Sequence, residues 1–211
     1  MTAMERCEKC GIVPVVVIED AKDAVATAKA LLAGGIDVME VTMRTAAAID
    51  VIKEVSAKVP EMLVGAGTVL TLEQCKECLA AGANFIVSPG FDDATVKYCV
   101  ENGIPVIPGC VTPTEIMYAK AYGLNTIKFF PANVYGGLKA MKALSGPFVG
   151  LKFVPTGGVS AETLKEYAEA PFIAAVGGSW VCTKKDIAEN NFDKITALSK
   201  EARDIIDAAR A

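Results

Sequence analysis

Short apolar runs alternate with longer amphipathic stretches along the 211-residue chain. The runs are rich in Val and Ile and recur roughly every 20 to 25 residues, a pattern typical of repeated βα units. We expect eight strands, at Gly11–Ile18, Ile36–Thr42, Met62–Gly67, Asn84–Ser88, Ile104–Pro108, Thr126–Phe130, Lys152–Pro155 and Phe172–Val176. With 52% of the residues apolar and only 22% charged, these strands should be buried on both faces, as in a parallel sheet.

The stretches between the strands predict helices. Their apolar residues recur at spacings of three and four, as in Val25, Ala28 and Leu31. A short helical segment is expected over about residues 1–10 and an amphipathic helix over about 192–209. The regular alternation predicts a single domain over residues 1–211, an α/β fold of the closed (β/α)₈ TIM barrel type.

An open, doubly wound sheet is the main alternative fold. Such a sheet usually has five or six strands and a nucleotide-binding loop. The segment Gly65–Leu70 begins like a dinucleotide-binding loop but ends in leucine, and the chain has no Walker lysine motif. The closed barrel is therefore favoured.

The net charge and the hydropathy pattern restrict the kinds of binding partner and the location that we expect for the protein. The formal net charge is −4, and the basic residues are scattered, so we expect neither nucleic acid nor an anionic membrane surface as a partner. No apolar run reaches the ~18 residues of a membrane span, and the first residues lack the apolar region of a signal peptide. We predict a cytoplasmic protein.

Cysteine and histidine usage restricts the chemistry. The two C-x-x-C pairs, Cys7/Cys10 and Cys75/Cys78, could form a zinc site, but packed, reduced thiols are the favoured interpretation. We therefore expect no metal. The chain has no histidine, so proton transfer must use carboxylate, lysine, hydroxyl or water.

Polar residues at the carboxyl ends of the predicted strands are the functional candidates. In the second strand, alternation places Glu40, Thr42 and Arg44 on one face. In the sixth strand, Lys128 stands between Ile127 and two phenylalanines, where burial disfavours the ammonium form and favours the nucleophilic amine. Residue position alone leaves two alternatives open: Lys128 could point outward, or it could pair with Glu40 purely for structure.

Two glycine-rich turns follow the seventh and eighth strands. They contain Thr156-Gly157-Gly158 and Gly177-Gly178-Ser179. Barrels of this class often bind a phosphate group at these two loops, through backbone N–H groups and a helix N-terminus. The paired turns therefore predict a phosphate-binding site.

Seven motifs occur in order: V-x-E-V-T-x-R, G-A-G-T-V, S-P-G, I-P-G, K-F-F-P-A, P-T-G-G and G-G-S-W. From about Gly11 onward, the chain resembles the class I aldolases that cleave 2-dehydro-3-deoxy-6-phosphogluconate and 4-hydroxy-2-oxoglutarate. The resemblance implies that Lys128 forms a Schiff base and that Glu40 is the general acid and base. It also implies a homotrimer that needs no cofactor.

The resemblance further assigns the substrate-binding residues. Arg44, Thr68 and Thr156 would surround the carboxylate of the pyruvoyl group. Gly157, Gly158, Gly178 and Ser179 would hold the phosphate, and Pro89 and Phe130 would line the pocket. The expected reaction yields pyruvate and glyceraldehyde 3-phosphate, with cleavage of the unphosphorylated 4-hydroxy-2-oxoglutarate as a further possibility. From a different class, a non-catalytic sugar-phosphate-binding barrel or a structural oligomer is the alternative.

Overall fold

The computed structural model describes residues 1–211, and its strands are all parallel to their neighbours. The eight strands are β1 (Ile12–Val16), β2 (Val38–Thr42), β3 (Leu63–Gly67), β4 (Phe85–Val87), β5 (Val106–Ile107), β6 (Thr126–Phe129), β7 (Lys152–Pro155) and β8 (Val176–Gly178). Seven of them fall within the predicted ranges. The eighth begins at Val176, where the predicted strand ended.

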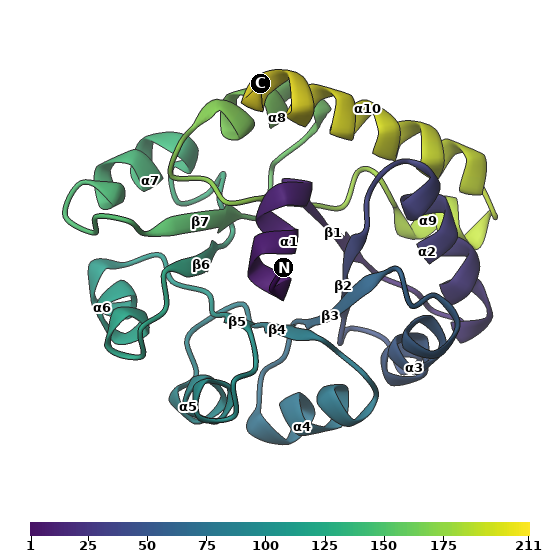
Figure 1. The fold of residues 1–211 in the computed structure, drawn as a ribbon, viewed down its shortest axis with the longest axis horizontal. Helices are drawn as coiled ribbons and strands as arrows, with labels where there is room; N and C mark the ends of the chain where they lie inside the picture. The colour runs from purple at the N-terminus through teal and green to yellow at the C-terminus, as the bar shows by residue number, and fades with distance from the viewer.

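The predicted closed (β/α)₈ TIM barrel is wrong. The strands follow one another around the middle of the molecule (Figure 1), but their hydrogen-bonded pairing is not continuous. It forms a six-stranded sheet in the order β5-β4-β3-β2-β1-β8 and a separate two-stranded sheet of β6 and β7. Only isolated bridges join the two sheets, at Gly109–Lys128 on one side and at Phe153–Ile173 and Thr156–Gly177 on the other.

Proline explains both interruptions. A proline residue has no N–H group and cannot donate to a strand pairing. Strand β5 is two residues long and is followed by Pro108, whose carbonyl oxygen accepts a hydrogen bond from the N–H group of Lys128 on β6 but which has no N–H group to donate in return. On the other side, Pro155 ends β7, and β8 starts only at Val176. The pairing of β6 and β7 with the six-stranded sheet is therefore limited to a few hydrogen bonds at each junction.

The helices lie mainly outside the strands (Figure 1). They are α1 (Ala3–Cys10), α2 (Ala24–Ala33), α3 (Ala48–Lys58), α4 (Leu72–Ala80), α5 (Asp93–Glu101), α6 (Pro113–Ala121), α7 (Gly137–Ser145), α8 (Ala161–Glu169), α9 (Lys184–Ala188) and α10 (Phe192–Arg210), with a 3₁₀ turn, η1, at Ala21–Asp23. Polar side chains cap several helix starts. For example, Thr112 and Glu115 form a reciprocal capping box at α6.

Helix α1 covers the amino ends of the strands. Arg6 pairs with Asp37, immediately before β2, at 2.6 Å between Nε and Oδ2. Glu8 pairs with Lys152, the first residue of β7. Because α1 occupies this end, the site predicted at the carboxyl ends of the strands has to open on the opposite side.

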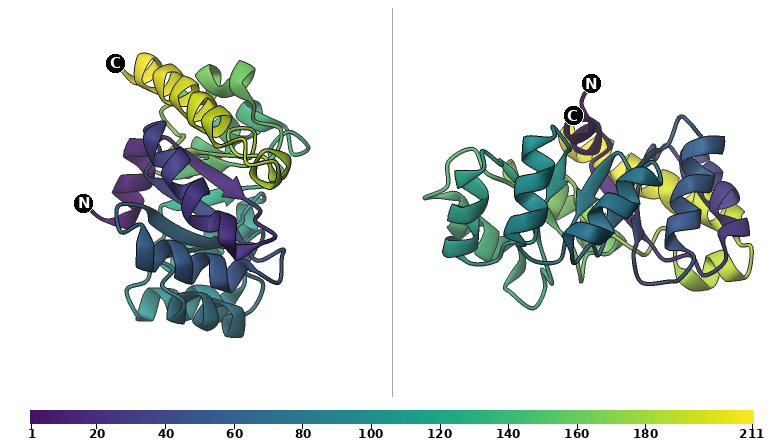
Figure 2. Two further views of the ribbon diagram at one scale, coloured as in Figure 1. Left: turned by 90° about the vertical axis from the view of Figure 1, so that its right-hand side faces the viewer. Right: turned by 90° about the horizontal axis from the view of Figure 1, so that it is seen from below.

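The C-terminal helix α10 runs along one side of the molecule, as both views of Figure 2 show. It packs against α2 and α8. The close approach to α2 requires glycine at its end, since a Cβ on Gly34 would lie 2.3 Å from Cβ of Ser199. Thr196 also donates a hydrogen bond to the carbonyl oxygen of Ala30, at 3.0 Å.

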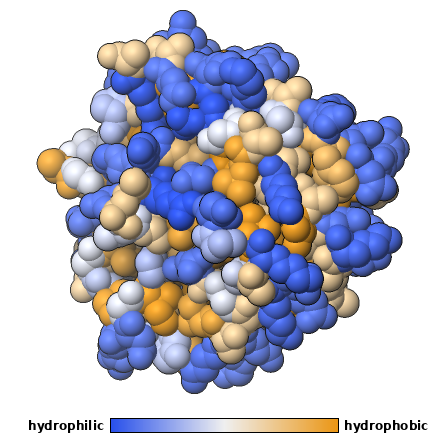
Figure 3. Space-filling model, turned by 45° about the vertical axis from the view of Figure 1, so that its right-hand side comes forward, coloured by the Kyte–Doolittle hydropathy of each residue, from blue (hydrophilic) through white to orange (hydrophobic).

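One cluster of 56 buried residues forms the core. Phe85, Phe129 and Phe153 are its largest fully buried side chains. The face drawn in Figure 3 is mostly hydrophilic, and its hydrophobic residues form small groups between the polar ones. The chain contains no helix with the length and apolar character needed to cross a membrane.

Replacing Gly65 with alanine is expected to destabilise the fold by about 1–3 kcal/mol, the usual effect of overpacking a core. The added Cβ would lie 2.2 Å from Cζ of Phe85. Urea unfolding measures the change, and Phe85→Leu in the same chain should recover part of the loss. Gly146→Ala is the control, because nothing lies nearer than 3.4 Å to its Cβ. A Gly65→Ala protein as stable as the wild type would contradict this packing.

Candidate active site

Lys128 lies on the inner face of β6. Alternation along the strand directs Phe129 away from Lys128, into an edge-to-face contact with Phe153 at 5.9 Å between ring centroids. The Lys128 side chain is only 3% exposed. Its Nζ lies 5.6 Å from the centre of the Phe130 ring, so an aromatic face shields the charge on one side. The outward-pointing alternative for Lys128 is therefore excluded.

Glu40 comes from the middle of β2 and meets Lys128 inside the ring of strands. Its Oε1 lies 3.2 Å from Nζ of Lys128, and its side chain is also only 3% exposed. The carboxylate passes over the bare Cα of Gly67 on β3, where a Cβ would lie 1.9 Å from Oε1. Glycine at this position therefore makes room for the carboxylate.

Because the Lys128–Glu40 pair is buried, each charged group depends on the other as its partner. Two opposite charges withdrawn from water lose hydration. Removing one member of such a pair typically costs about 3–5 kcal/mol, because the remaining charge is left uncompensated. The geometry thus fixes an amine and a carboxylate against one another, a combination suited to nucleophilic attack and proton transfer.

Arg44 and Thr68 meet just beyond the ends of β2 and β3. Nε of Arg44 donates a hydrogen bond to Oγ1 of Thr68 at 3.1 Å. Thr68 has a positive φ of 58°, which is uncommon for a residue with a branched side chain. Such backbone strain tends to persist where the surroundings fix it, often at functional sites.

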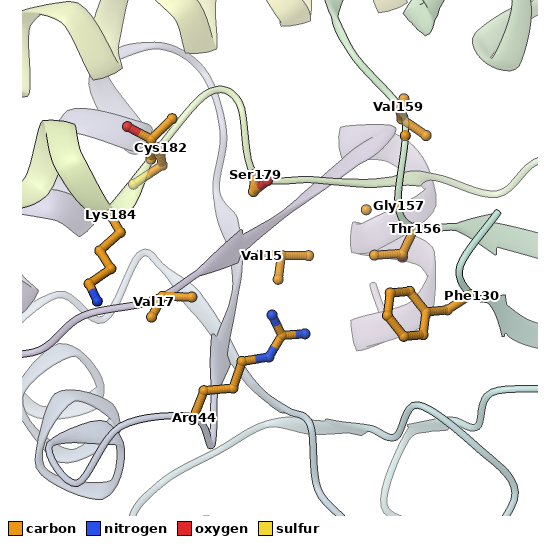
Figure 4. A pocket seen from close by; sticks show the side chains of 13 residues that line it. Val15, Val17, Arg44, Phe130, Thr156, Gly157, Val159, Ser179, Cys182 and Lys184 are labelled. Carbon is orange, nitrogen blue, oxygen red and sulfur yellow. The ribbon is translucent and has the colours of Figure 1, made fainter. Parts of the chain in front are cut away.

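A cavity of about 360 Å³ opens beside this arginine (Figure 4). The predicted site residues that line it are Arg44, Phe130, Thr156, Gly157, Gly158 and Ser179. In Figure 4, the Arg44 guanidinium and the Phe130 ring point into the same space, with Thr156 and Gly157 next to Phe130. The structure therefore brings together residues that follow the carboxyl ends of β2, β6, β7 and β8.

The two glycine turns form one wall of the cavity. Gly157 and Gly158 have φ values of 92° and 78°, a backbone that side chains with a Cβ rarely adopt. A Cβ on Gly177 would lie 2.2 Å from Oγ1 of Thr156, so the two turns touch. Helix α8 begins just after the first turn, capped by Ser160. Bare backbone N–H groups near a helix start are suited to an anion.

Five predicted site residues do not line the cavity. Lys128 and Glu40 are buried. Thr68 is connected to the cavity only through its hydrogen bond with Arg44, which lines the cavity. Gly178 is buried against the ring of Trp180. Pro89 lies against Gly109, the residue that bridges to Lys128, and so belongs to the same neighbourhood without facing the cavity.

Seven lining residues were not predicted from the sequence: Val15, Val17, Val159, Gly177, Cys182, Thr183 and Lys184. Gly177 belongs to the second glycine turn that predicted a phosphate site, although no contact was assigned to it. The valines gave no signal, since apolar residues are usually structural. Thr183 and Lys184 follow the last glycine turn, and that position could have drawn attention to them. Burial raises the pKa of the Cys182 thiol to about 12, so this side chain does not compete as a nucleophile.

The two C-x-x-C pairs lie in separate helices, α1 and α4, and all seven cysteines are free thiols. Cys75 instead contacts Cys99 of α5, with 3.6 Å between the Sγ atoms. No cluster of three or more His, Cys, Asp or Glu side chains is arranged to hold a metal ion.

Comparisons with known proteins agree on one family. The family model described as KDPG and KHG aldolase matches residues 3–198. A 2-dehydro-3-deoxy-phosphogluconate aldolase from Treponema pallidum is 44% identical over 206 residues, which covers 98% of each chain.

Solved structures extend this similarity to three dimensions. A KDPG aldolase from Legionella pneumophila, with pyruvate captured at low pH as a covalent carbinolamine intermediate, superimposes with a TM-score of 0.90 at 40% identity. The match covers 94% of this chain and 95% of that one. The aldolase of Zymomonas mobilis with 3-phosphoglycerate gives 0.89 at 41% identity, over 99% and 97% of the two chains.

Gly67→Ala is expected to push the Glu40 carboxylate away from Lys128, because the new Cβ would occupy its place. A crystal structure of the variant should show Nζ and Oε1 further apart than the present 3.2 Å. Gly90→Ala is the matched control, since nothing lies within 4 Å of its Cβ. An unchanged ion pair in Gly67→Ala would contradict the close approach described here.

Proposed function

The chain belongs to the KDPG and KHG aldolase family, and we propose that Lys128 and Glu40 carry out its reaction. The protein is a lyase that cleaves 2-dehydro-3-deoxy-6-phosphogluconate to pyruvate and glyceraldehyde 3-phosphate through a Schiff base. One observation carries the assignment of residues: Nζ of Lys128 lies 3.2 Å from Oε1 of Glu40, in the interior beside the cavity.

In the first step, the neutral amine of Lys128 attacks the C2 carbonyl carbon of the substrate. The carbinolamine loses water, and a protonated imine results. Glu40 accepts the amine proton when Lys128 becomes neutral, because the two groups share a hydrogen bond. It then returns this proton to the carbinolamine hydroxyl, which leaves as water, so Glu40 is a carboxylate again before the second step. With no histidine in the chain, this carboxylate is the acid and base nearest to the amine.

In the second step, Glu40 takes the proton of the C4 hydroxyl, directly or through a water molecule. The C3–C4 bond then breaks, its electrons pass to the imine, and glyceraldehyde 3-phosphate leaves. The remaining enamine takes a proton at C3, and water releases pyruvate from Lys128. The same groups run the addition in reverse.

The remaining residues position the two ends of the substrate. Arg44 and Thr68, with Thr156, are assigned to the carboxylate, since an arginine can bind it through two parallel hydrogen bonds. The turns at Gly157-Gly158 and Gly178-Ser179 are assigned to the phosphate. Pro89 and Phe130 complete the apolar surroundings. Because the amine and the carboxylate act on the 2-keto acid part that both substrates share, we include the unphosphorylated 4-hydroxy-2-oxoglutarate as a second substrate.

Borohydride reduction in the presence of pyruvate is expected to leave a 1-carboxyethyl group on Nζ of Lys128, which peptide mass spectrometry locates. Lys128→Arg should keep the ion pair but form no adduct, because a guanidinium is not a nucleophile at this pH. Lys152→Arg is the matched control, a strand lysine paired with Glu8 at the other end of the molecule. An adduct on a different lysine would overturn the assignment, and no adduct at all would favour the non-catalytic binding protein.

Glu40→Gln is expected to lower kcat for cleavage by about 10²- to 10⁴-fold, the usual contribution of a positioned acid or base. Lys128 would remain, so borohydride trapping with pyruvate should still occur. Steady-state kinetics with coupled detection of pyruvate measures the loss. Turnover close to that of the wild type would exclude Glu40 from proton transfer.

We further propose a homotrimer of single-domain chains in the cytoplasm. The exposed side chains of Val134, Tyr135 and Val149 support an assembly surface.

A single core cluster supports one domain, and seven free thiols support a reducing compartment. Sedimentation velocity should give three times the 22.1-kDa mass of the chain. A monomer at micromolar concentration would contradict the trimer.

A further inference from the structure

Lys184 stands in the wall between the active-site cavity and a second cavity. It is the first residue of α9, which begins after the segment Trp180–Thr183 that follows the last glycine turn. Together with Val17, it lines both spaces. In Figure 4, Lys184 and Phe130 lie on opposite sides of the active-site cavity, with Val15 and the Arg44 guanidinium between them.

The second cavity, of about 200 Å³, is rich in carboxylates. Glu19, Asp20 and Asp23 line it, against a single further cation, Lys22. Asp20 is already paired with Lys22, at 2.8 Å. Glu19 is paired with Lys184, with 2.7 Å between Oε1 and Nζ. Lys184 is thus held on the side of the carboxylates.

The Glu19–Lys184 pair is easily exchanged. Its side chains are 57% exposed for Lys184 and 62% exposed for Glu19. Exposed ion pairs contribute little to stability, because water and salt screen them. A second anion on the other side of Lys184 can therefore compete with Glu19 for the ammonium group.

The active-site cavity has few positive charges for a phosphate group. Arg44 and Lys184 are the two cationic side chains that line it. Arg44 is bonded to Thr68 and is assigned to the carboxylate end of the substrate. The glycine turns offer neutral N–H groups, and Ser179 a hydroxyl. Without Lys184, a phosphate dianion at these turns would have no cation of its own.

We propose that Lys184 determines specificity for the phosphorylated substrate, by exchanging Glu19 for the phosphate group. The proposal rests on the function proposed above, in which the glycine turns hold the phosphate. Lys184 touches no reacting atom and is not a catalytic residue. Glu19 is its competitor, and the strength of phosphate binding depends on the balance between the two anions.

Lys184→Met is expected to lower kcat/KM for 2-dehydro-3-deoxy-6-phosphogluconate by about tenfold, since the variant loses one charge-assisted hydrogen bond. The change should fall mainly on KM, because the contact is equal in the ground and transition states. For the dephosphorylated analogue, 2-dehydro-3-deoxygluconate, kcat/KM should not change. Lys185→Met is the matched control, because Lys185 faces Glu189 and lines neither cavity.

Glu19→Gln should act in the opposite direction. It removes the competitor and leaves Lys184 free, so KM for the phosphorylated substrate should fall by about two- to threefold. The dephosphorylated analogue should again be unaffected. Lys184→Arg should recover most of the selectivity that Lys184→Met loses, because it restores the positive charge.

Calorimetric titration with inorganic phosphate tests the site independently of turnover. Phosphate should bind to Lys184→Met about tenfold more weakly than to the wild type, and to Glu19→Gln more tightly. Equal losses for both substrates, or unchanged phosphate affinity, would overturn the role of Lys184. Failure of the aldolase assignment would look different: wild-type protein would give no pyruvate adduct on Lys128, whatever its affinity for phosphate.

Discussion

The buried ion pair between Lys128 and Glu40 is the constraint on which the rest of the site depends. Two charges, each only 3% exposed, are tolerated in this interior because they face one another at 3.2 Å. The surrounding sequence serves that contact. Gly67 leaves room for the carboxylate, and Phe130 covers the ammonium group. Burial alone would give a structural pair. The cavity beside it, with an arginine at one end and glycine turns along a wall, gives the pair access to a substrate.

The interrupted strand pairing places this chemistry at a junction. Lys128 lies on β6, which belongs to the small sheet with β7, whereas Glu40 lies in the middle of the six-stranded sheet. Few backbone hydrogen bonds cross from one sheet to the other, at Gly109 and near Ile173 and Gly177. Side-chain packing and the ion pair therefore contribute much of what holds β6 opposite β2. Helix α1 covers the amino ends of the strands, so the substrate site is formed by the loops at their carboxyl ends.

The positions of most strands and helices could be predicted from the sequence, whereas the predicted closure of the strands into a barrel was wrong. Short apolar runs located β6 and β7, and alternation placed Glu40, Thr42 and Arg44 on one face of β2. The orientation of Lys128 was left open by its position, and the structure shows it buried against Glu40. Pairing between strands is a tertiary property, and the effect of Pro108 and Pro155 on it was not anticipated. Apolar lining residues such as Val15 could not be predicted, because a local sequence pattern does not show which apolar side chain faces a cavity. The position of Lys184 after the last glycine turn could have drawn attention to it, but the role proposed for it depends on two cavities that only the folded chain creates.

A crystal structure of the wild-type protein soaked with pyruvate tests the central claim most directly. We predict continuous electron density from Nζ of Lys128 to C2 of pyruvate, with the carboxylate of the adduct at Arg44 and Thr68 and with Glu40 beside the new bond. Pyruvate bound without a covalent link, or linked to another lysine while the Lys128–Glu40 pair remains intact, would contradict this account.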